Sequence, residues 1–338
     1  MMMNLNKFGF GLLMVLGSLL VLGSSNWFSA WVGLEMNLMA FLPLLVGKDP
    51  LSVEGALKYF LVQVVASMIL IVSILVFYYW GLNMKFYINM IFFSLSMSLG
   101  LAPFHYWFPE VCEGLSWGMM MILLIWQSLG LFGMMIHLPV GGLLDWFIIV
   151  GMLVGGLGGL NQGSLRKIMA YSSINHMGWM LCALSMSAQL WFVYYVLYGI
   201  VTFFICLLFK LWGLYYLSQI VMLGGVFSGV KLVFYMSFLS LGGLPPFLGF
   251  LPSMLIIYYL LTGGYLFLCF MSVLLSLVSL YYYLRVCYVI YSGGSSSMLW
   301  VGSCIDLSMK VDVKMNFFMV FLGGVSILGL LILVWSII

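Results

Sequence analysis

Two short stretches, Gly100-Leu101-Ala102-Pro103-Phe104 and Gly243-Leu244-Pro245-Pro246-Phe247, decide the predicted fold. A second proline follows each at the same distance, Pro109 in the first copy and Pro252 in the second, so both fit G-L-x-P-F-x-x-x-x-P. Each stretch interrupts an apolar run, and an irregular backbone at membrane depth is tolerated only where protein or a wet cavity satisfies its polar groups. We therefore expect a broken transmembrane helix at both places.

The composition of the whole chain places these breaks in a bilayer. Of 338 residues, 65% are hydrophobic and 6% are charged, whereas a soluble domain carries about 25% charged residues. A membrane-spanning helix needs about 20 mostly apolar residues, so we predict an all-α polytopic membrane protein. The net charge of +3 is small and scattered, which gives no indication of nucleic-acid binding.

Apolar runs predict eleven helices. They lie near 8–24, 27–46, 54–80, 86–107, 115–137, 142–160, 166–185, 189–216, 231–262, 264–291 and 316–337. The second break comes five helices after the first, an odd number, so the two copies should enter the membrane in opposite directions. This is the inverted-repeat architecture of many ion-coupled transporters. We expect one membrane domain, with a first repeat over 1–137, a second over 142–291, and a loop with a C-terminal helix over 292–338.

The few cations predict the orientation of the chain. With eleven spans, most of them fall on the side that holds the N-terminus: Lys7, Lys48, Arg166, Lys167, Lys210, Lys231, Arg285, Lys310 and Lys314. The other side holds Lys85. Because positive charge collects on the cytoplasm-like side, we expect the N-terminus to face the matrix if the membrane is mitochondrial.

Four ionisable residues are candidates for proton transfer. Glu35 lies near the middle of the second predicted helix, where a carboxyl group is unfavourable and usually faces a cavity or a partner; the alternative is a neutral Glu35 bonded to the backbone. Lys58 lies about one turn into the third helix and could instead snorkel to the interface. His176 and His105 could relay protons or simply be hydrogen-bonded. We expect Glu110 and Glu113 in a short, solvated loop near the matrix-facing side; the alternative is that they lie at a proton entrance.

Enzyme-type sites are not indicated. The chain contains six cysteines but no CxxC spacing, which argues against zinc and iron–sulfur sites. The sequence has no phosphate loop and no metal-spaced histidine set. We expect neither a cofactor nor a metal on this chain.

Several motifs resemble one family. They are Trp31-Val-Gly-Leu-Glu35, Ala56-Leu-Lys-Tyr-Phe60, Leu99-Gly-Leu-Ala-Pro-Phe-His105, Gly159-Leu-Asn-Gln162, Arg166-Lys-Ile-Met-Ala-Tyr-Ser-Ser-Ile-Asn-His-Met-Gly-Trp179 and Leu239-Ser-Leu-Gly-Gly-Leu-Pro-Pro246. In this order they resemble the chain-2 family of antiporter-like subunits of mitochondrial NADH:ubiquinone oxidoreductase, respiratory complex I. The resemblance implies a multi-pass subunit of the mitochondrial inner membrane with eleven helices. It also implies that the chain translocates protons. Its partners would be other membrane-arm subunits, including neighbouring antiporter-like chains, and lipids. Flavin, iron–sulfur clusters and quinone would belong to other subunits.

By the same resemblance, Glu35 matches the family's functional glutamate, but three expected lysines are serines here. These are Ser98, Ser128 and Ser253. A serine can hold water in a proton wire but cannot supply a positive charge. Some arthropod mitochondria decode AGG as lysine where the usual invertebrate code assigns serine, so a decoding difference would change all three positions together. The alternatives to a proton-pumping subunit are a scaffold subunit with a weakened proton path and a separate cation/proton antiporter.

Overall fold

The computed structural model describes residues 2–47, 49–80, 84–139, 141–221 and 228–292. Within these residues the regular secondary structure is helical, and an isolated antiparallel bridge pairs Ser164 with Tyr216. In this part of the chain, six helices are long and apolar enough to cross a membrane, and four shorter apolar helices accompany them. The all-α polytopic prediction is confirmed, while the helix predicted near 316–337 lies outside the described residues.

The chain divides into two compact units, residues 1–151 and 152–338. The helices of the first unit are α1 (Met2–Gly23), α2 (Trp27–Leu45), α3 (Pro50–Trp80), α4 (Met84–Leu99), α5 (Trp107–Gly114), α6 (Trp117–Met121), the π-helix η1 (Ile122–Trp126) and α7 (Gln127–Met135). α8 (Gly142–Gly159) contains the boundary. The second unit continues with α9 (Leu165–Met186), α10 (Ala188–Trp212), α11 (Leu217–Val221), α12 (Ser228–Leu241), α13 (Phe250–Thr262) and α14 (Leu266–Ser292). The predicted inverted relation between the two halves stays a prediction.

Both predicted helix breaks are present, and they share one backbone geometry. α4 ends before Gly100 and α12 ends near Gly243, where the φ angles of +74° and +67° favour glycine. In the first break the amide of Leu101 donates to the Ser96 carbonyl at 3.0 Å. In the second break the amide of Leu244 donates to the Leu239 carbonyl at 3.4 Å. These are Schellman endings, which satisfy carbonyl groups that the next turn of helix would otherwise have bonded.

Four predicted helix bounds are wrong. α1 begins at Met2 rather than near residue 8. The fourth helix ends at Leu99 rather than near residue 107, because the break leaves a separate short helix, α5. α3 begins at Pro50 rather than near residue 54, and proline suits the first helical position because its missing N–H group is not needed there. α10 ends at Trp212, where Gly213 takes a left-handed conformation with φ +61°.

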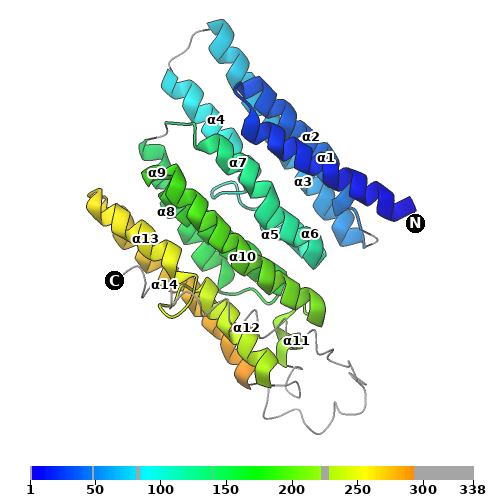
Figure 1. Cartoon of the computed structure of the whole chain (residues 1–338), viewed down its shortest axis with the longest axis vertical. Helices are drawn as coiled ribbons and strands as arrows, with labels where there is room; N and C mark the ends of the chain where they lie inside the picture. Colours follow the sequence, from blue (N-terminus) through cyan, green and yellow to red (C-terminus); the bar gives the residue numbers. More distant parts are fainter. Residues whose placement is uncertain (1, 48, 81–83, 140, 222–227, 293–338) are drawn as a thin grey trace. The chain divides into compact units, whose positions relative to one another are not determined.

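The first unit packs α3 against the broken helix. α3 contacts α2 on one side and both α4 and α5 on the other, and α1, α2 and α3 lie side by side in Figure 1. The Tyr59 ring of α3 lies 5.4 Å from the Phe41 ring of α2 and 5.8 Å from the Trp107 ring of α5. α3 therefore joins the helix of Glu35 to the helix break.

Many large apolar side chains point outward, as a membrane protein requires. Tyr79 and Phe8, for example, are 81% and 67% exposed in the isolated chain. In a bilayer such side chains contact lipid or neighbouring subunits, since lipid is as apolar as they are.

Candidate functional site

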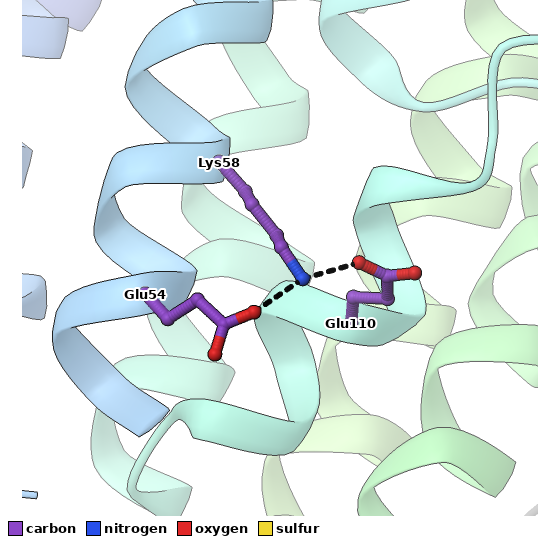
Figure 2. Close-up of polar contacts among 3 residues, drawn as sticks. All are labelled: Glu54, Lys58 and Glu110. Carbon is purple, nitrogen blue, oxygen red and sulfur yellow. Dashed lines mark hydrogen bonds and ion pairs between the residues drawn. The ribbon is translucent and has the colours of Figure 1, made fainter. Parts of the chain in front are cut away.

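The candidate site is an ionic cluster where α3 meets the broken helix. Lys58 Nζ lies 2.7 Å from Glu54 Oε1, one turn earlier on α3, and 2.6 Å from Glu110 Oε2 on α5. Figure 2 shows the Lys58 ammonium group between the two carboxylates. The three side chains carry a net charge of −1 and remain 39–59% exposed in the isolated chain. Lys58 is thus held by two acidic groups rather than extended freely toward the interface.

The structure corrects the predicted loop that contained Glu110. Residues 107–114 form the helix α5, which packs along the first turns of α3. Glu110 lies in the first turn of α5, where a carboxylate is favoured by the positive end of the helix dipole. The side chain is exposed as predicted, but it is also paired with Lys58.

A second polar contact from α3 lies on the other side of the break. Gln63 Nε2 donates to the Ser98 carbonyl oxygen of α4 at 2.8 Å. The Ser98 side chain is buried, and its hydroxyl donates to the Leu95 carbonyl of its own helix at 2.9 Å. His105, also buried, lies within the break, with Nδ1 3.2 Å from the Pro103 carbonyl oxygen and its ring stacked on Tyr106. His105 is therefore bonded to the backbone of the break.

Ser128 lies next to an unusual helical turn and an amide pair. The turn Ile122–Trp126 is π-helical, a feature found frequently at functional sites. The Ser128 hydroxyl donates back to the Leu124 and Ile125 carbonyls of this turn at 3.2 and 2.9 Å. Beside it, Gln127 exchanges two hydrogen bonds of 2.7 and 3.2 Å with Asn37 of α2.

Glu35 lies on a different face of α2 from this amide pair. Asn37 follows Glu35 by two residues, which is about 200° around a helix, and Glu35 is half-buried. Of the residues one turn away from Glu35, Val32 and Met39 are 37% and 62% exposed, whereas Leu38 is 5% exposed. Among the described residues, none forms a hydrogen bond or ion pair with the Glu35 carboxylate. Glu35 therefore lies at the edge between the buried and the exposed face of α2.

The second unit holds the remaining two predicted site residues. His176 Nδ1 lies 2.9 Å from the Tyr194 hydroxyl oxygen of α10. Ser253 is half-buried near the start of α13 and donates to the Phe250 carbonyl at 2.9 Å. Its hydroxyl lies 3.8 Å from where a Cβ atom would stand at Gly243. Ser253 is thus beside the second break, as Ser98 is beside the first.

The structure brings together only part of the predicted set. Lys58 and Ser98 both lie along the line where α3 meets the broken helix, whereas Glu35 and Ser128 lie on other faces of the same unit. Sequence reasoning gave no role to Gln63 or to the Asn37–Gln127 pair. The signal was present, because Asn and Gln side chains in membrane helices hydrogen-bond across helices, but the candidates taken from the sequence were ionisable residues and serines.

Metal ligation is not indicated in the described part of the chain. No group of three or more His, Cys, Asp or Glu side chains there could hold a metal ion. The five cysteines within the described ranges are buried thiols. The expectation that cofactors lie on other subunits stays a prediction.

Comparisons with known proteins agree on one family. The family described as NADH:quinone oxidoreductase/Mrp antiporter, TM, matches residues 24–279. The chain is 38% identical to NADH-ubiquinone oxidoreductase chain 2 of Anopheles gambiae, over 96% of this chain and 97% of that one. Its fold is similar to a chain of respiratory complex I from Thermus thermophilus with bound aureothin, with TM-score 0.84, 23% identity and coverage of 96% and 78%. It is also similar to a chain of the Mrp complex from Dietzia sp., with TM-score 0.74, 18% identity and coverage of 83% and 60%.

Proposed function

Because the chain belongs to the transmembrane family of NADH:quinone oxidoreductase and Mrp antiporter subunits, we propose that its first unit moves protons through groups beside the first helix break. The chain is an antiporter-like, proton-translocating subunit of the respiratory complex I membrane arm, in the mitochondrial inner membrane beside other membrane-arm subunits. Flavin, iron–sulfur clusters and quinone are proposed to lie on those other subunits. NADH oxidation and ubiquinone reduction there are coupled to proton movement here.

The observation that carries the proposal is the 2.6 Å contact between Lys58 Nζ and Glu110 Oε2, next to the break. At that distance the ammonium group and the carboxylate form an ion pair within hydrogen-bond reach, which keeps the proton on Lys58 while Glu110 is charged. A proton that reaches Glu110 neutralises the carboxylate and weakens its attraction for the Lys58 ammonium group, and release of that proton to the next acceptor restores the ion pair. Glu54, 2.7 Å away, offers a second acceptor.

Glu35 is proposed to lie deeper in the membrane than this cluster. The Phe41–Tyr59 ring contact marks a common level of α2 and α3. Glu35 precedes Phe41 by six residues of α2, which is about 9 Å at 1.5 Å per residue. It therefore lies on the far side of that level from the connection between α2 and α3. Lys58 directly precedes Tyr59, on the side of the short connection between the two helices. A carboxyl group facing lipid at such depth is unfavourable, so we propose that a neighbouring subunit covers the outward face of Glu35 in the assembled arm.

The orientation is proposed from the cations. The connection between α2 and α3 lies on the side of the chain that collects most lysines and arginines, which the positive-inside rule assigns to the matrix. The Lys58 cluster would then be the matrix-side mouth of the path. Impermeant labelling of intact mitoplasts tests this. Labelling of residues 47–53 from the intermembrane side would refute it.

The proton path is tested with isosteric amides. In complex I carrying Glu110→Gln or Glu35→Gln, each change keeps the side-chain size but removes titration, so protons pumped per NADH should fall while assembly and NADH oxidation remain. Asp145→Asn, a carboxylate of α8 outside the cluster, is the matched control and should pump normally. Unchanged pumping in both glutamine variants would reject the proposed path.

A second candidate function, a scaffold subunit with a weakened proton path, is favoured by the three serines. The three hydroxyl groups each donate a hydrogen bond to a backbone carbonyl of their own helix. They belong to Ser98, Ser128 and Ser253. A scaffold predicts normal assembly and normal pumping in both glutamine variants. The similarity to chain 2 of complex I over nearly the full length favours complex I over a separate antiporter.

A further inference from the structure

An apolar groove runs along the second half of α3 in the first unit. It has a volume of about 670 Å³, and ten of its eleven lining residues are aliphatic or aromatic, so it suits an apolar ligand. α3 contributes the residues between Val64 and Phe77, and the first turns of α4 contribute the rest. The exception is Ser73, whose hydroxyl donates to the Leu70 carbonyl of its own helix at 2.6 Å. We name this feature the α3 groove.

The length of the α3 groove matches one leaflet of a bilayer. Val64 and Phe77 are 13 residues apart on α3, which is about 20 Å at a rise of 1.5 Å per residue. One leaflet supplies about half of a hydrocarbon core that is about 30 Å thick. Val65 stands at the middle of the 31-residue helix and Phe77 near its end. The groove therefore reaches from the membrane surface to about the centre of the bilayer.

The groove presents one continuous face of α3. Val65, Met68 and Val72 follow one another at spacings of three and four residues, which places them on the same side of a helix. They are 47%, 57% and 55% exposed in the isolated chain. At the outer end, the Phe77 ring of α3 stacks on the Tyr87 ring of α4 at 4.4 Å and joins the two helices. A molecule in the groove therefore contacts apolar side chains along its whole length.

The width of the groove excludes a helix and fits an acyl chain. A volume of about 670 Å³ over about 20 Å gives a mean cross-section of about 34 Å². An α-helix with its side chains is about 10–12 Å in diameter, which requires about 80 Å² or more. A hydrocarbon chain is little wider than the contact distance between carbon atoms, about 4 Å. An acyl chain can therefore lie inside the groove, whereas a helix of a neighbouring subunit could insert only its edge.

A positive charge stands at the outer end of the groove. Lys85 directly precedes Phe86, which lines the groove, and its side chain is exposed. Among the described residues, none forms an ion pair with Lys85. Tyr78 and Tyr79 at the end of α3 are 74% and 81% exposed, and exposed tyrosines are typical of the membrane–water interface. Lys85 is therefore placed to attract an anionic lipid headgroup.

We propose that the α3 groove binds one acyl chain of an anionic phospholipid whose phosphate group lies at Lys85. The acyl chain runs along α3 from Phe77 toward Val65. Because the surrounding lipid is as apolar as the groove, the chain alone gives little preference between lipids, and the selectivity for an anionic headgroup comes from Lys85. The site lies at the opposite end of α3 from Lys58, and the proposal does not depend on the proposed proton path.

The test is photo-crosslinking of purified complex I in phosphatidylcholine nanodiscs. Two probe lipids carry the same diazirine on one acyl chain, phosphatidylglycerol, which is anionic, and phosphatidylcholine, which is not. Peptide mapping then measures the labelling of residues 64–77. Phosphatidylglycerol should label this segment about fivefold more than phosphatidylcholine, the factor that corresponds to one lysine near a charged membrane surface. Lys85→Gln should abolish the preference, and Lys85→Arg should keep it because the positive charge remains.

A second pair of variants tests the groove itself. Val72 lines the groove and is 55% exposed, so Val72→Trp should fill the groove without entering the core, and the preference for phosphatidylglycerol should be lost. Leu75→Trp is the matched control, because Leu75 lies on the same helix, is 47% exposed and is not among the lining residues. This variant should label as wild type does.

Three results would overturn the proposal. The first is equal labelling of residues 64–77 by the two probes in wild type. The second is an unchanged preference for phosphatidylglycerol in either Lys85→Gln or Val72→Trp. The third is no labelling of this segment in wild type, which would show that a neighbouring subunit covers the groove.

Discussion

The Asn37–Gln127 amide pair should be strongly coupled energetically. We expect Asn37→Leu and Gln127→Met, each alone, to destabilise the subunit, because each leaves the other amide buried without its partner. The double variant should be close to wild type, since both polar groups are then gone. The pair makes two hydrogen bonds, of 2.7 and 3.2 Å. Interhelical hydrogen bonds in membranes are worth about 0.6 kcal/mol each, so the coupling energy should be about 1 kcal/mol.

The assay is a double-mutant cycle on the rate of thermal inactivation of purified complex I. One kcal/mol corresponds to a factor of about five at room temperature. Because the double variant should match wild type, each single variant carries about half of the coupling energy and should inactivate about two- to threefold faster than wild type. If the inactivation rate of the double variant is instead raised by the product of the two single-variant factors, the effects are additive. The two amides then do not act as a pair.

Three further predictions follow from the described contacts. Gly249→Ala should prevent α13 from packing on the end of α12, because the added Cβ would overlap the Ser240 carbonyl oxygen; subunit assembly falls, and normal assembly would contradict the packing. Glu54→Gln should impair pumping less than Glu110→Gln does, since an i,i+4 pair on one helix contributes only about 0.2–0.5 kcal/mol; an equal or larger loss would reverse the ranking. Tandem mass spectrometry of the peptides that span the three serine positions should return lysine masses if the decoding hypothesis holds, and serine masses would reject it. Those positions are Ser98, Ser128 and Ser253.

The sequence by itself determined the helices and the places where two of them break. Hydropathy is a property of consecutive residues, so the apolar runs predicted most helix bounds within a few residues. The breaks at Gly100 and Gly243 were readable because glycine and proline act on their own backbone, with positive φ in one case and a missing N–H group in the other. The errors fell where a local signal was ignored, as at Gly213, or where a short helix such as α5 is stabilised mainly by packing.

Only the tertiary structure decided which polar groups meet. Lys58 and Glu110 are 52 residues apart, and Asn37 and Gln127 are 90 apart, so no local pattern pairs them. The same holds for His176 and the tyrosines of α10. A contact across helices depends on the rotation of each helix about its axis, which is set by packing along its whole length. Glu35 illustrates the difference: its depth follows from counting residues, but the face it occupies follows from how α2 packs on α1 and α3.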